Sequence, residues 1–474
     1  MDLSKSKRLI AIFLAIFLLL AVGIYAIAYE QFRYGAVTGY APNPDFLIGE
    51  IYDGVEVSQK IVNPADVLER IEVFFGTYAK TNSGTIIVSL LDEENNLLVS
   101  KEVNNEDISK DGFFEILLPE QIQVARGTML TFHLKTQGCE KENAFTIYAG
   151  DAYKENTNKY FYLENEGLGT LCVRLNGYNQ LVFYKIYWLI VAVVFIGLVL
   201  YIRGCWRGIL KGRTNLLAML LTIYYRYRFL LKQLVSRDFK TKYKRSALGM
   251  AWSFLNPLLT MSVQYLVFSS LFKSGTPNYP LYLLTGIVFF SFFAESVSMG
   301  MTSIAQNASL IKKVYMPKYI YPLSRTISSL VNFAFALIPL LLVILITRTP
   351  IRFAILLLVF DIICLLMFTL GMTLLLSTAM TFFQDTQFLW GIVSMMWQYM
   401  TPIFYNESII PEKMLPVYRL NPMYQYISFA RTCIIEGVSP GPDAYFYCMG
   451  SGLAVLMLGL VIFKKQQDKF VLYL

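Results

Sequence analysis

The stretch RYRFLLKQLVSRDFKTKYKRSALGMAWSFLNPLLTMSVQYLVFSSLF, residues 226–272, decides the fold of this chain. Its first part, up to about Val235, continues an apolar face at helical spacing that consists of Leu216, Leu220, Ile223, Tyr227, Leu230 and Leu234. Arg226, Lys232 and Gln233 fall off that face. An apolar side opposite a polar side predicts a helix that lies in the membrane interface.

The rest of the stretch predicts a cytoplasmic basic cluster followed by a membrane span. The basic cluster consists of Arg237, Lys240, Lys242, Lys244 and Arg245, with Asp238 as its only acid. From Leu248 the chain is apolar for about 25 residues, which is long enough to cross a bilayer. Asn256 and Pro257 interrupt this run early. A proline in a span frees a backbone carbonyl, which protein or water must then satisfy.

The composition indicates a polytopic membrane protein, since 55% of the 474 residues are hydrophobic. The net charge of +8 hides a division along the chain. Residues 30–183 contain 12 basic and 23 acidic side chains, and the remainder contains 29 basic and 10 acidic ones. The excess positive charge lies beside the apolar runs, so orientation by the positive-inside rule explains it better than nucleic-acid binding.

Residues 1–29 predict an N-terminal membrane anchor, and residues 30–180 an all-β domain outside the cytoplasm. Lys5, Lys7 and Arg8 precede the first apolar run and place the N-terminus in the cytoplasm, although Ala26-Ile27-Ala28 also fits a cleaved signal peptide. Residues 30–180 contain short alternating runs with turn residues between them, which predicts an antiparallel sandwich. The runs are 71–75, 85–90, 97–103, 113–118, 129–134 and 145–148.

The sequence does not decide the role of the β domain. It could contact or gate a glycan, or it could be a spacer. The sequence around residues 49–59, followed by alternating strands, resembles a jelly-roll carbohydrate-binding module. Exposure of Phe74, Phe75 or Tyr78 would favour glycan contact, because sugar faces stack on aromatic rings. Cys139 and Cys172 both lie in this segment, where an oxidising environment permits a disulfide but sequence separation says nothing about their distance.

Membrane segments make up the remainder of the chain. Residues 181–203 predict a second span, and residues 204–247 hold the interfacial helix and the basic cluster. Residues 248–474 predict six further spans, which gives about eight in total with both termini in the cytoplasm. The fold class is therefore an α-helical polytopic membrane protein with an inserted all-β sandwich domain.

The opening stretch resembles the start of the permease subunit of ABC-2 polysaccharide exporters, the group that moves O-antigens and teichoic acids. The residues that carry the resemblance are Ala247, Leu248, Gly249, Trp252, Asn256, Pro257, Phe268 and Phe272. It covers roughly residues 214–474. It implies a homodimer that docks two copies of an ABC ATPase, with ATP and Mg bound by that separate subunit and no cofactor on this chain.

A second resemblance concerns the sequence NASLIKKVYMPKYIYPLS, residues 307–324, within an expected cytoplasmic loop. It is similar to the coupling helix of ABC-2 permeases, here 305–318, which inserts into a groove on the ATPase. The ATPase-coupling residues that this implies are Asn307, Leu310, Ile311, Lys313, Met316 and Pro317. A transmitted push needs a short rigid helix with an apolar plug and a positive rim, and prolines stiffen its ends. Lysines that merely set topology are the alternative.

Residues 401–440 predict an outer re-entrant hairpin, because their apolar pieces are too short to cross and are broken by prolines. The hairpin also resembles the paired outer helices of the family, and the matching residues are Pro402, Tyr405, Asn421, Pro422 and Arg431.

The resemblance also implies a glycan channel. Its candidate aromatics are Phe268, Trp397, Tyr399 and Tyr405, which would bind sugar faces weakly and repeatedly. Packing or interface anchoring is the alternative for these side chains. The basic cluster would meet the pyrophosphate of an undecaprenyl-linked glycan, or would bind anionic lipid instead.

No catalytic or metal-binding motif occurs in the sequence. It contains no G-x-x-x-x-G-K-[ST] phosphate loop, no H-E-x-x-H and no cysteine quartet, so we expect no enzyme activity and no metal site. The resemblance implies the permease of an ATP-driven exporter of a lipid-linked polysaccharide in a bacterial cell membrane. An ABC-2 exporter of lipids or drugs is one alternative, and a membrane protein with a sugar-binding ectodomain and no transport is another.

Overall fold

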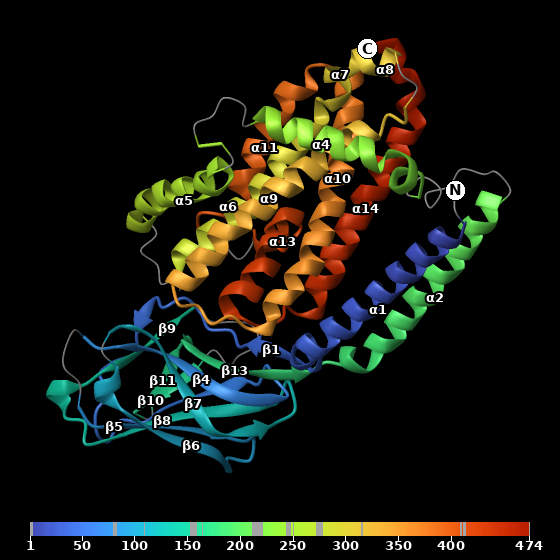
Figure 1. The fold of residues 1–474 in the computed structure, drawn as a ribbon. Coiled ribbons are helices and arrows are strands. Elements are labelled where there is room, and N and C mark those ends of the chain that lie inside the picture. Colours follow the sequence, from blue (N-terminus) through green and yellow to red (C-terminus); the bar gives the residue numbers. More distant parts are fainter. Residues whose placement is uncertain are drawn as a thin grey trace. The chain divides into compact units, whose positions relative to one another are not determined.

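A computed structural model describes residues 3–78, 83–108, 110–151, 159–163, 165–210, 221–242, 248–249, 251–271, 278–313, 316–407, 410 and 414–473. The chain forms two compact units, a β-rich unit from Phe32 to Tyr184 and a helical unit from Met1–Gln31 and Lys185–Leu474 (Figure 1). This confirms the expected fold class. Leu216, Leu220, Lys244, Arg245, Ala247 and Phe272 lie outside the described residues.

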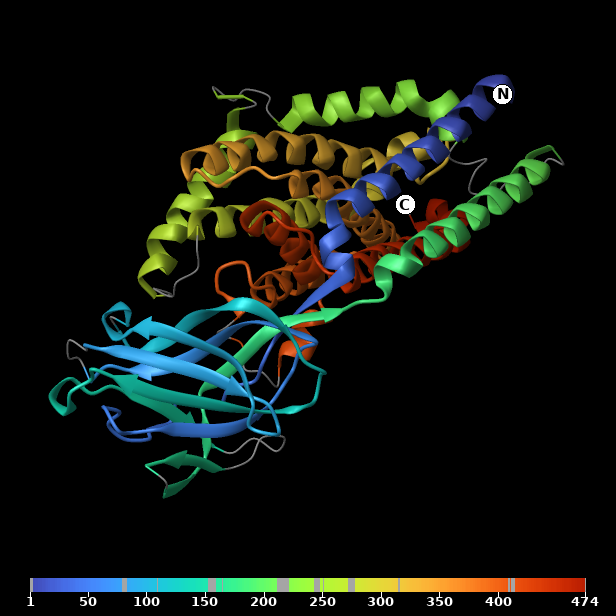
Figure 2. The ribbon, with the colours of Figure 1, turned by 90° about the horizontal axis from the view of Figure 1, so that it is seen from below.

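Two antiparallel sheets form the β-rich unit, and they lie as two layers in Figure 2. The first sheet has the order β1 (Tyr34–Thr38), β13 (Val173–Gln180), β4 (Val67–Gly76), β9 (Thr146–Gly150) and β12 (Thr170–Leu171), with β2 (Phe46–Leu47) on β9 and β7 (Gly112–Gln123) on β4. The second has the order β11 (Asn165–Leu168), β10 (Lys159–Tyr162), β3 (Val57–Val62), β8 (Met129–Gln137), β5 (Thr85–Leu91) and β6 (Leu97–Asn104).

One apolar core joins the two sheets. Alternate side chains of β4 and β5 are buried, so Ile71 and Val73 meet Ile86 and Val88 in the same cluster. This burial is the reason that period-2 alternation predicts the strands. Each of the six predicted runs overlaps a strand. The strands from β10 to β12 have four residues or fewer, which leaves too little alternation for a sequence pattern.

The two cysteines of the β-rich unit are not joined, so the disulfide that the sequence permits is corrected to two buried thiols. The thiol of Cys139 lies 3.0 Å from the carbonyl oxygen of Ser83. The thiol of Cys172 lies 3.4 Å from the carbonyl oxygen of Pro42. Each sulfur is therefore packed against a different loop. Burial raises the pKa of Cys172 to about 12 and also raises that of Cys139.

The aromatic residues that could contact a glycan differ in exposure. Phe75 is fully buried, Phe74 is half-buried, and Tyr78 is exposed. The ring of Phe74 packs edge-on against Phe113 and Tyr148, with centroid distances of 5.0 Å in both cases. Of the three, only Tyr78 is thus exposed, and its exposed fraction is 36%.

The helical unit begins with α1 (Leu3–Arg33) and α2 (Phe183–Leu210), which contact each other through side chains. Phe17 stacks on Phe195 at 6.2 Å, and the hydroxyl of Tyr187 donates to the carbonyl of Ala21 at 2.7 Å.

The remaining elements form the helical bundle labelled in Figure 1. They are η3 (Ile223–Tyr227), α4 (Arg228–Lys242), α5 (Ala251–Leu271), α6 (Tyr279–Met301), α7 (Ser303–Gln306), α8 (Ala308–Lys313), α9 (Ile320–Ile346), η4 (Phe353–Leu357), α10 (Leu358–Phe382), α11 (Thr386–Met400), α12 (Leu415–Arg419), α13 (Pro422–Arg431), η6 (Thr432–Glu436), α14 (Pro442–Gln466), η7 (Gln467–Lys469) and α15 (Phe470–Tyr473).

Six helices of the described chain are long and apolar enough to cross a membrane: α1, α2, α6, α9, α10 and α14 with their short continuations. The chain is therefore a multi-pass membrane protein. The two other expected spans are helices that do not meet this criterion by themselves. α11 has 15 residues, which is about 22 Å of helix against a hydrocarbon core of about 30 Å.

The helices α10 and α14 approach each other closely through glycines. A Cβ atom added at Gly371 would lie 2.5 Å from the carbonyl oxygen of Val455. One added at Gly459 would lie 2.5 Å from the carbonyl oxygen of Gly371. Small residues at such crossings allow backbones of membrane helices to pack tightly.

Candidate functional site

The segment between α6 and α9 consists of two short helices, α7 and α8, that meet at Asn307. Asn307 is buried, and its side-chain amide donates to the carbonyl of Ser303 at 2.7 Å. Its own carbonyl accepts the amides of Leu310 and Ile311, both at 3.0 Å. Asn307 therefore fixes the angle between the two helices, which makes the segment rigid.

The two faces of α8 differ. Ser309, Lys312 and Lys313 are exposed, and Leu310 is half-buried. Ile311 instead packs against the chain's own cluster, which includes Phe463 and Phe470. The exposed side of α8 is therefore basic, whereas Ile311 packs against the rest of the helical unit.

The second half of the segment is held by the C-terminus. Met316 and Pro317 are half-buried. The ammonium of Lys318 donates to the carbonyl of Gln467 at 2.5 Å and lies 5.9 Å from the ring of Phe470. Phe470 is fully buried and also contacts Phe382 at the end of α10. The C-terminal turn therefore braces the segment against α10 and α14.

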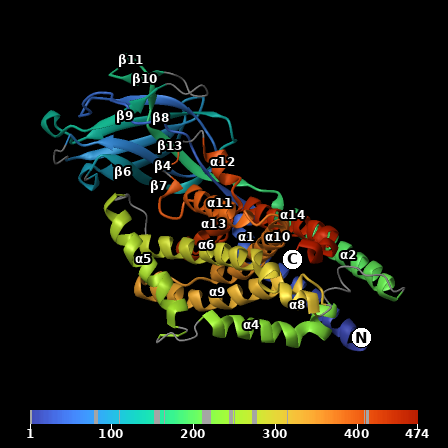
Figure 3. The ribbon, with the colours of Figure 1, turned by 90° about the horizontal axis from the view of Figure 1, so that it is seen from above.

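The helix α4 runs alongside α9, as Figure 3 shows. Leu231 and Leu234 pack on Ile320, and Phe239 lies 5.9 Å from Phe335. α4 continues to Lys242, so the basic cluster begins inside the last two turns of a helix rather than after it. The apolar side of the predicted interfacial helix is occupied by α9 over these residues.

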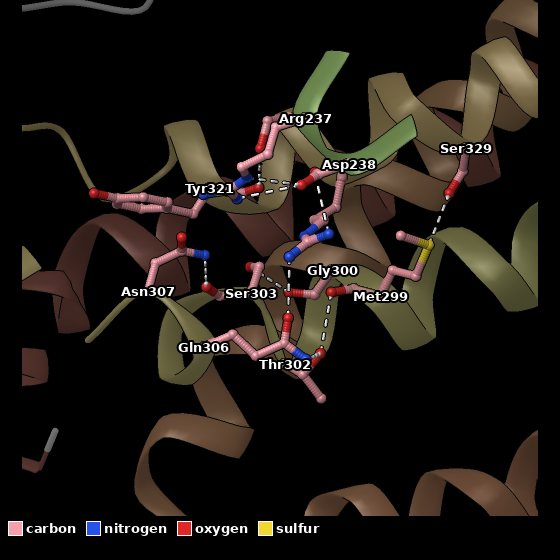
Figure 4. Close-up of polar contacts among 12 residues, drawn as sticks. Arg237, Asp238, Met299, Gly300, Thr302, Ser303, Gln306, Asn307, Tyr321 and Ser329 are labelled. Carbon is pink, nitrogen blue, oxygen red and sulfur yellow. Dashed lines mark hydrogen bonds and ion pairs between the residues drawn. The ribbon is translucent and has the colours of Figure 1, made fainter. Parts of the chain in front are cut away.

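A series of ion pairs and hydrogen bonds connects α4 to the α7–α8 segment (Figure 4). Asp238 is buried and lies 3.1 Å from a guanidinium nitrogen of Arg325 on α9, a charge contact without the alignment of a hydrogen bond. The other carboxylate oxygen accepts from Arg237 at 3.2 Å. Arg325 also donates to the amide oxygen of Gln306 at 3.0 Å. Displacement of α7 must therefore move or break contacts to α4.

A second link ties the end of α4 to α6. The ammonium of Lys242 donates to a carboxylate oxygen of Glu295 at 2.6 Å, and the amide of Asn332 on α9 donates to the same oxygen at 2.9 Å. Three helices thus meet at one carboxylate.

The structure describes three of the five residues predicted to meet a lipid pyrophosphate. Arg237 and Lys242 are paired with carboxylates, and Lys240 is exposed. Lys244 and Arg245 lie outside the described residues. The sequence patterns do not identify Arg325 or Lys318 as residues that hold this segment. The feature of the sequence that could have indicated Arg325 is that it is a lone arginine near the start of an apolar run.

At the other end of the helical unit, the predicted outer residues come together. The guanidinium of Arg431 donates to the carbonyl of Pro402 at 2.7 Å and to that of Ile403 at 3.2 Å. It also donates to the carbonyl of Tyr282 at 3.1 Å and lies 3.3 Å from that ring's centroid. The adjoining Gly286 has to be small, since an added Cβ would lie 2.9 Å from Arg431.

Asn421 begins α13 and ties it to α11. Its carbonyl oxygen accepts the indole N–H of Trp397 at 2.7 Å and the amide of Met423 at 3.1 Å. Its amide donates to the hydroxyl of Thr401 at 2.9 Å. Pro422 follows at the first helical position, where its missing N–H costs nothing.

The four candidate channel aromatics do not form one group. Trp397 belongs to a packed cluster with Phe293, at 5.2 Å, and Phe368, at 6.1 Å, so it braces the bundle. Phe268 stacks on Phe404 at 5.4 Å, and Tyr399 is exposed beside Phe404 at 6.1 Å. The hydroxyl of Tyr405 donates to the carbonyl of Tyr399 at 2.8 Å.

Comparison with known proteins identifies the group to which this architecture belongs. The family model for the ABC-2 type transporter matches residues 230–435. The "O-antigen export system permease protein RfbA" of Myxococcus xanthus is 30% identical over 252 residues, which is 52% of this chain and 95% of that protein. A protein of the same name from Klebsiella pneumoniae is 30% identical over 243 residues, 51% of this chain and 93% of that protein.

The chain belongs to the ABC-2 type transporter family. The matched region begins in α4 and ends in η6, and thus includes both ends of the site described above. The β-rich unit precedes it. Within the described part of this ABC-2 transporter, no cluster of three or more His, Cys, Asp or Glu residues is arranged to hold a metal ion.

Proposed function

We propose that this chain is the permease subunit of an ATP-driven exporter that moves a lipid-linked polysaccharide, such as an O-antigen or a teichoic acid, out of a bacterial cell. The proposal is supported by the family membership and by the printed function of the relatives, which are O-antigen export permeases. Two copies of the chain pair and dock two copies of a separate ATPase, which binds ATP and Mg. Both termini lie in the cytoplasm, and residues 30–180 lie outside.

The observation that carries the proposal is the braced α7–α8 segment. It presents the exposed Lys312 and Lys313 on α8, which begins after the buried Asn307, and Lys318 beyond α8 donates to the carbonyl of Gln467. A rigid positive surface is what a nucleotide-driven partner needs in order to push on the bundle. The contacts through Arg325 and Asp238 give that push a route to α4.

At the same end of the bundle, Lys240 and the neighbouring basic residues receive the lipid pyrophosphate by charge. Phe268 and Tyr399, which both pack against the buried Phe404, contact the glycan toward the outer end of its path, together with Tyr405. Trp397 instead packs inside the bundle against Phe293 and Phe368.

The test is co-purification with the ATPase of the same export system. We expect the double variant Lys312→Glu and Lys313→Glu to lose most of the bound ATPase. Lys464→Glu with Lys465→Glu is the matched control, because these two lysines are also exposed and also adjacent, at the end of α14. Equal retention of the ATPase by both variants would show that α8 is not the docking surface. Deletion of the gene should remove the polysaccharide from the cell surface, and unchanged surface polysaccharide would refute the export function.

A further inference from the structure

A cavity of about 400 Å³, with both polar and apolar side chains in its wall, lies within the helical unit, between α5, α6 and α9. Ligand pockets for small molecules have volumes of roughly 300–1,000 Å³, so this cavity is large enough for one. Its wall contains the amides of Asn256 and Asn332, the hydroxyls of Ser291 and Ser329, and the carboxylate of Glu295. Polar side chains within a bilayer are costly, and a wall that gathers several of them indicates a functional site.

The kinds of group in this wall indicate the ligand. Amides and hydroxyls both donate and accept hydrogen bonds, and a carboxylate accepts several. Trp252 adds an indole ring that is 43% exposed, against which an apolar ring face can stack. A pyranose has hydroxyls around its edge and C–H bonds on its faces, so it uses both kinds of contact. An acyl or polyprenyl chain could satisfy none of the polar groups.

The cavity adjoins the coupling contacts. A second cavity, of about 620 Å³, is lined by Gln306, Asn307 and Arg325 and shares both Lys242 and Glu295 with the first. The ion pair between Lys242 and Glu295, at 2.6 Å, therefore lies at the boundary of the two cavities. Separation of this pair would connect them.

We infer that the cavity between α5, α6 and α9 binds a sugar unit of the transported glycan, and that the Lys242–Glu295 pair closes it toward the α7–α8 segment. The inference rests on the proposed function, whose glycan supplies the ligand. Asn256 and Asn332 bind hydroxyls from opposite helices, and Glu295 exchanges its hydrogen bond from Asn332 for one from the sugar.

The test measures protection of a cysteine placed in the wall. Ser291→Cys lines the cavity, and Ser298→Cys is its control, because both serines are exposed on α6 but Ser298 lines neither cavity. A membrane-impermeant thiol reagent is applied to inside-out vesicles in the absence of nucleotide. The vesicles come from cells that make the polysaccharide and from cells that lack its first glycosyltransferase. The second strain still contains the bare lipid carrier.

We expect thiol labelling of the Ser291→Cys protein to be several-fold slower in vesicles that contain the glycan, with no difference for Ser298→Cys. Addition of Asn256→Leu or Asn332→Leu should abolish this protection while the ATPase still co-purifies. Labelling of Ser291→Cys that is as fast as that of Ser298→Cys in both strains would overturn the inference and leave a water-filled cavity. Labelling of Ser291→Cys that is slower than that of Ser298→Cys in both strains would assign the cavity to the lipid carrier and would also overturn the inference. Neither result depends on whether deletion of the gene removes the surface polysaccharide.

Discussion

Arg431 is a buried guanidinium that backbone oxygens and an aromatic ring stabilise. Its fork reaches the carbonyls of Pro402 and Ile403 on one side and that of Tyr282 on the other. A guanidinium presents five donors in a fixed plane, which suits three carbonyls from two segments. The residue therefore closes the turn after α11 against α6.

We expect Arg431→Lys to destabilise the protein, because an ammonium cannot reach all three carbonyls at once. Loss of one hydrogen bond to a buried charged group costs about 1.5–3 kcal/mol. The measurement is the thermal unfolding midpoint of the protein in nanodiscs. Arg419→Lys is the control, since Arg419 is exposed and pairs with Glu407 at the surface, where such pairs contribute little. An equal shift in both variants would contradict this role of Arg431.

Asp53 predicts a pH dependence in the β-rich unit. The amide of Cys139 donates to Asp53 at 3.0 Å and that of Gly138 at 2.7 Å, and these bonds lower the pKa of its carboxyl below the ordinary value of 3.8. A lowered pKa in the folded state means that the carboxylate stabilises the fold above pH 3.8 and loses this effect as the pH falls through the folded value.

The stability difference between the wild type and Asp53→Asn should therefore be largest at neutral pH and should shrink well below pH 3.8. Thermal unfolding of the full chain across this pH range measures it. Asp107→Asn, at an exposed acid, should differ little from the wild type at any pH. A difference for Asp53→Asn that persists unchanged in acid would exclude the carboxylate as its source.

At the scale of the elements, α4 shows where sequence patterns are sufficient and where they are not. Its apolar spacing predicts a helix with one buried side, and Leu234 and Tyr227 do pack on α9. The pattern does not identify what covers that side. The sequence shows Asp238 only as the one acid of the basic cluster, yet Asp238 is buried because it pairs with Arg325, from a helix more than 80 residues later in the chain. Such long-range pairing cannot be read from local spacing.

The same limit applies to the outer aromatics. The family resemblance identifies Asn421, Pro422 and Arg431, and in the structure Asn421 caps α13 while Pro422 takes its first position. Trp397 and Tyr399 have the same local context on α11, although one is packed and the other exposed. The difference depends on neighbouring helices that are distant in sequence.

We expect Asp238→Asn to loosen α4 from α9, because the buried end of Arg325 loses its counter-charge. The expected loss of local stability is about 1–3 kcal/mol. Hydrogen exchange of the amides in α4 measures it, and exchange should become faster there than in α10. Asp385→Asn changes an exposed acid in the turn before α11 and should leave α4 unchanged. Unaltered exchange in α4 of Asp238→Asn would show that apolar packing alone holds this helix.

For the whole molecule, the β-rich unit is an insertion between two consecutive membrane helices. β1 follows α1 directly and pairs antiparallel with β13, which precedes α2. Tyr34 is opposite Gln180 and Thr38 is opposite Asn176, and the amide of Leu181 donates to the carbonyl of Arg33 at 2.8 Å. The two ends of the insertion are thus already held side by side by their own backbone hydrogen bonds.

This geometry predicts that the β-rich unit can be removed without loss of ATPase docking. In the shortened chain, Thr38 is joined to Asn176 through Asn-Gly, since a two-residue turn of this type connects directly paired antiparallel residues. The expected result is normal membrane insertion and the same amount of co-purified ATPase as for the full chain, because α8, the proposed docking helix, belongs to the other unit. Loss of the ATPase would show that the two units depend on each other. If the ATPase is retained, the amount of surface polysaccharide distinguishes the two roles that the sequence leaves open. Export continues if the β-rich unit is a spacer. Export stops, although the ATPase is still bound, if the unit contacts the glycan.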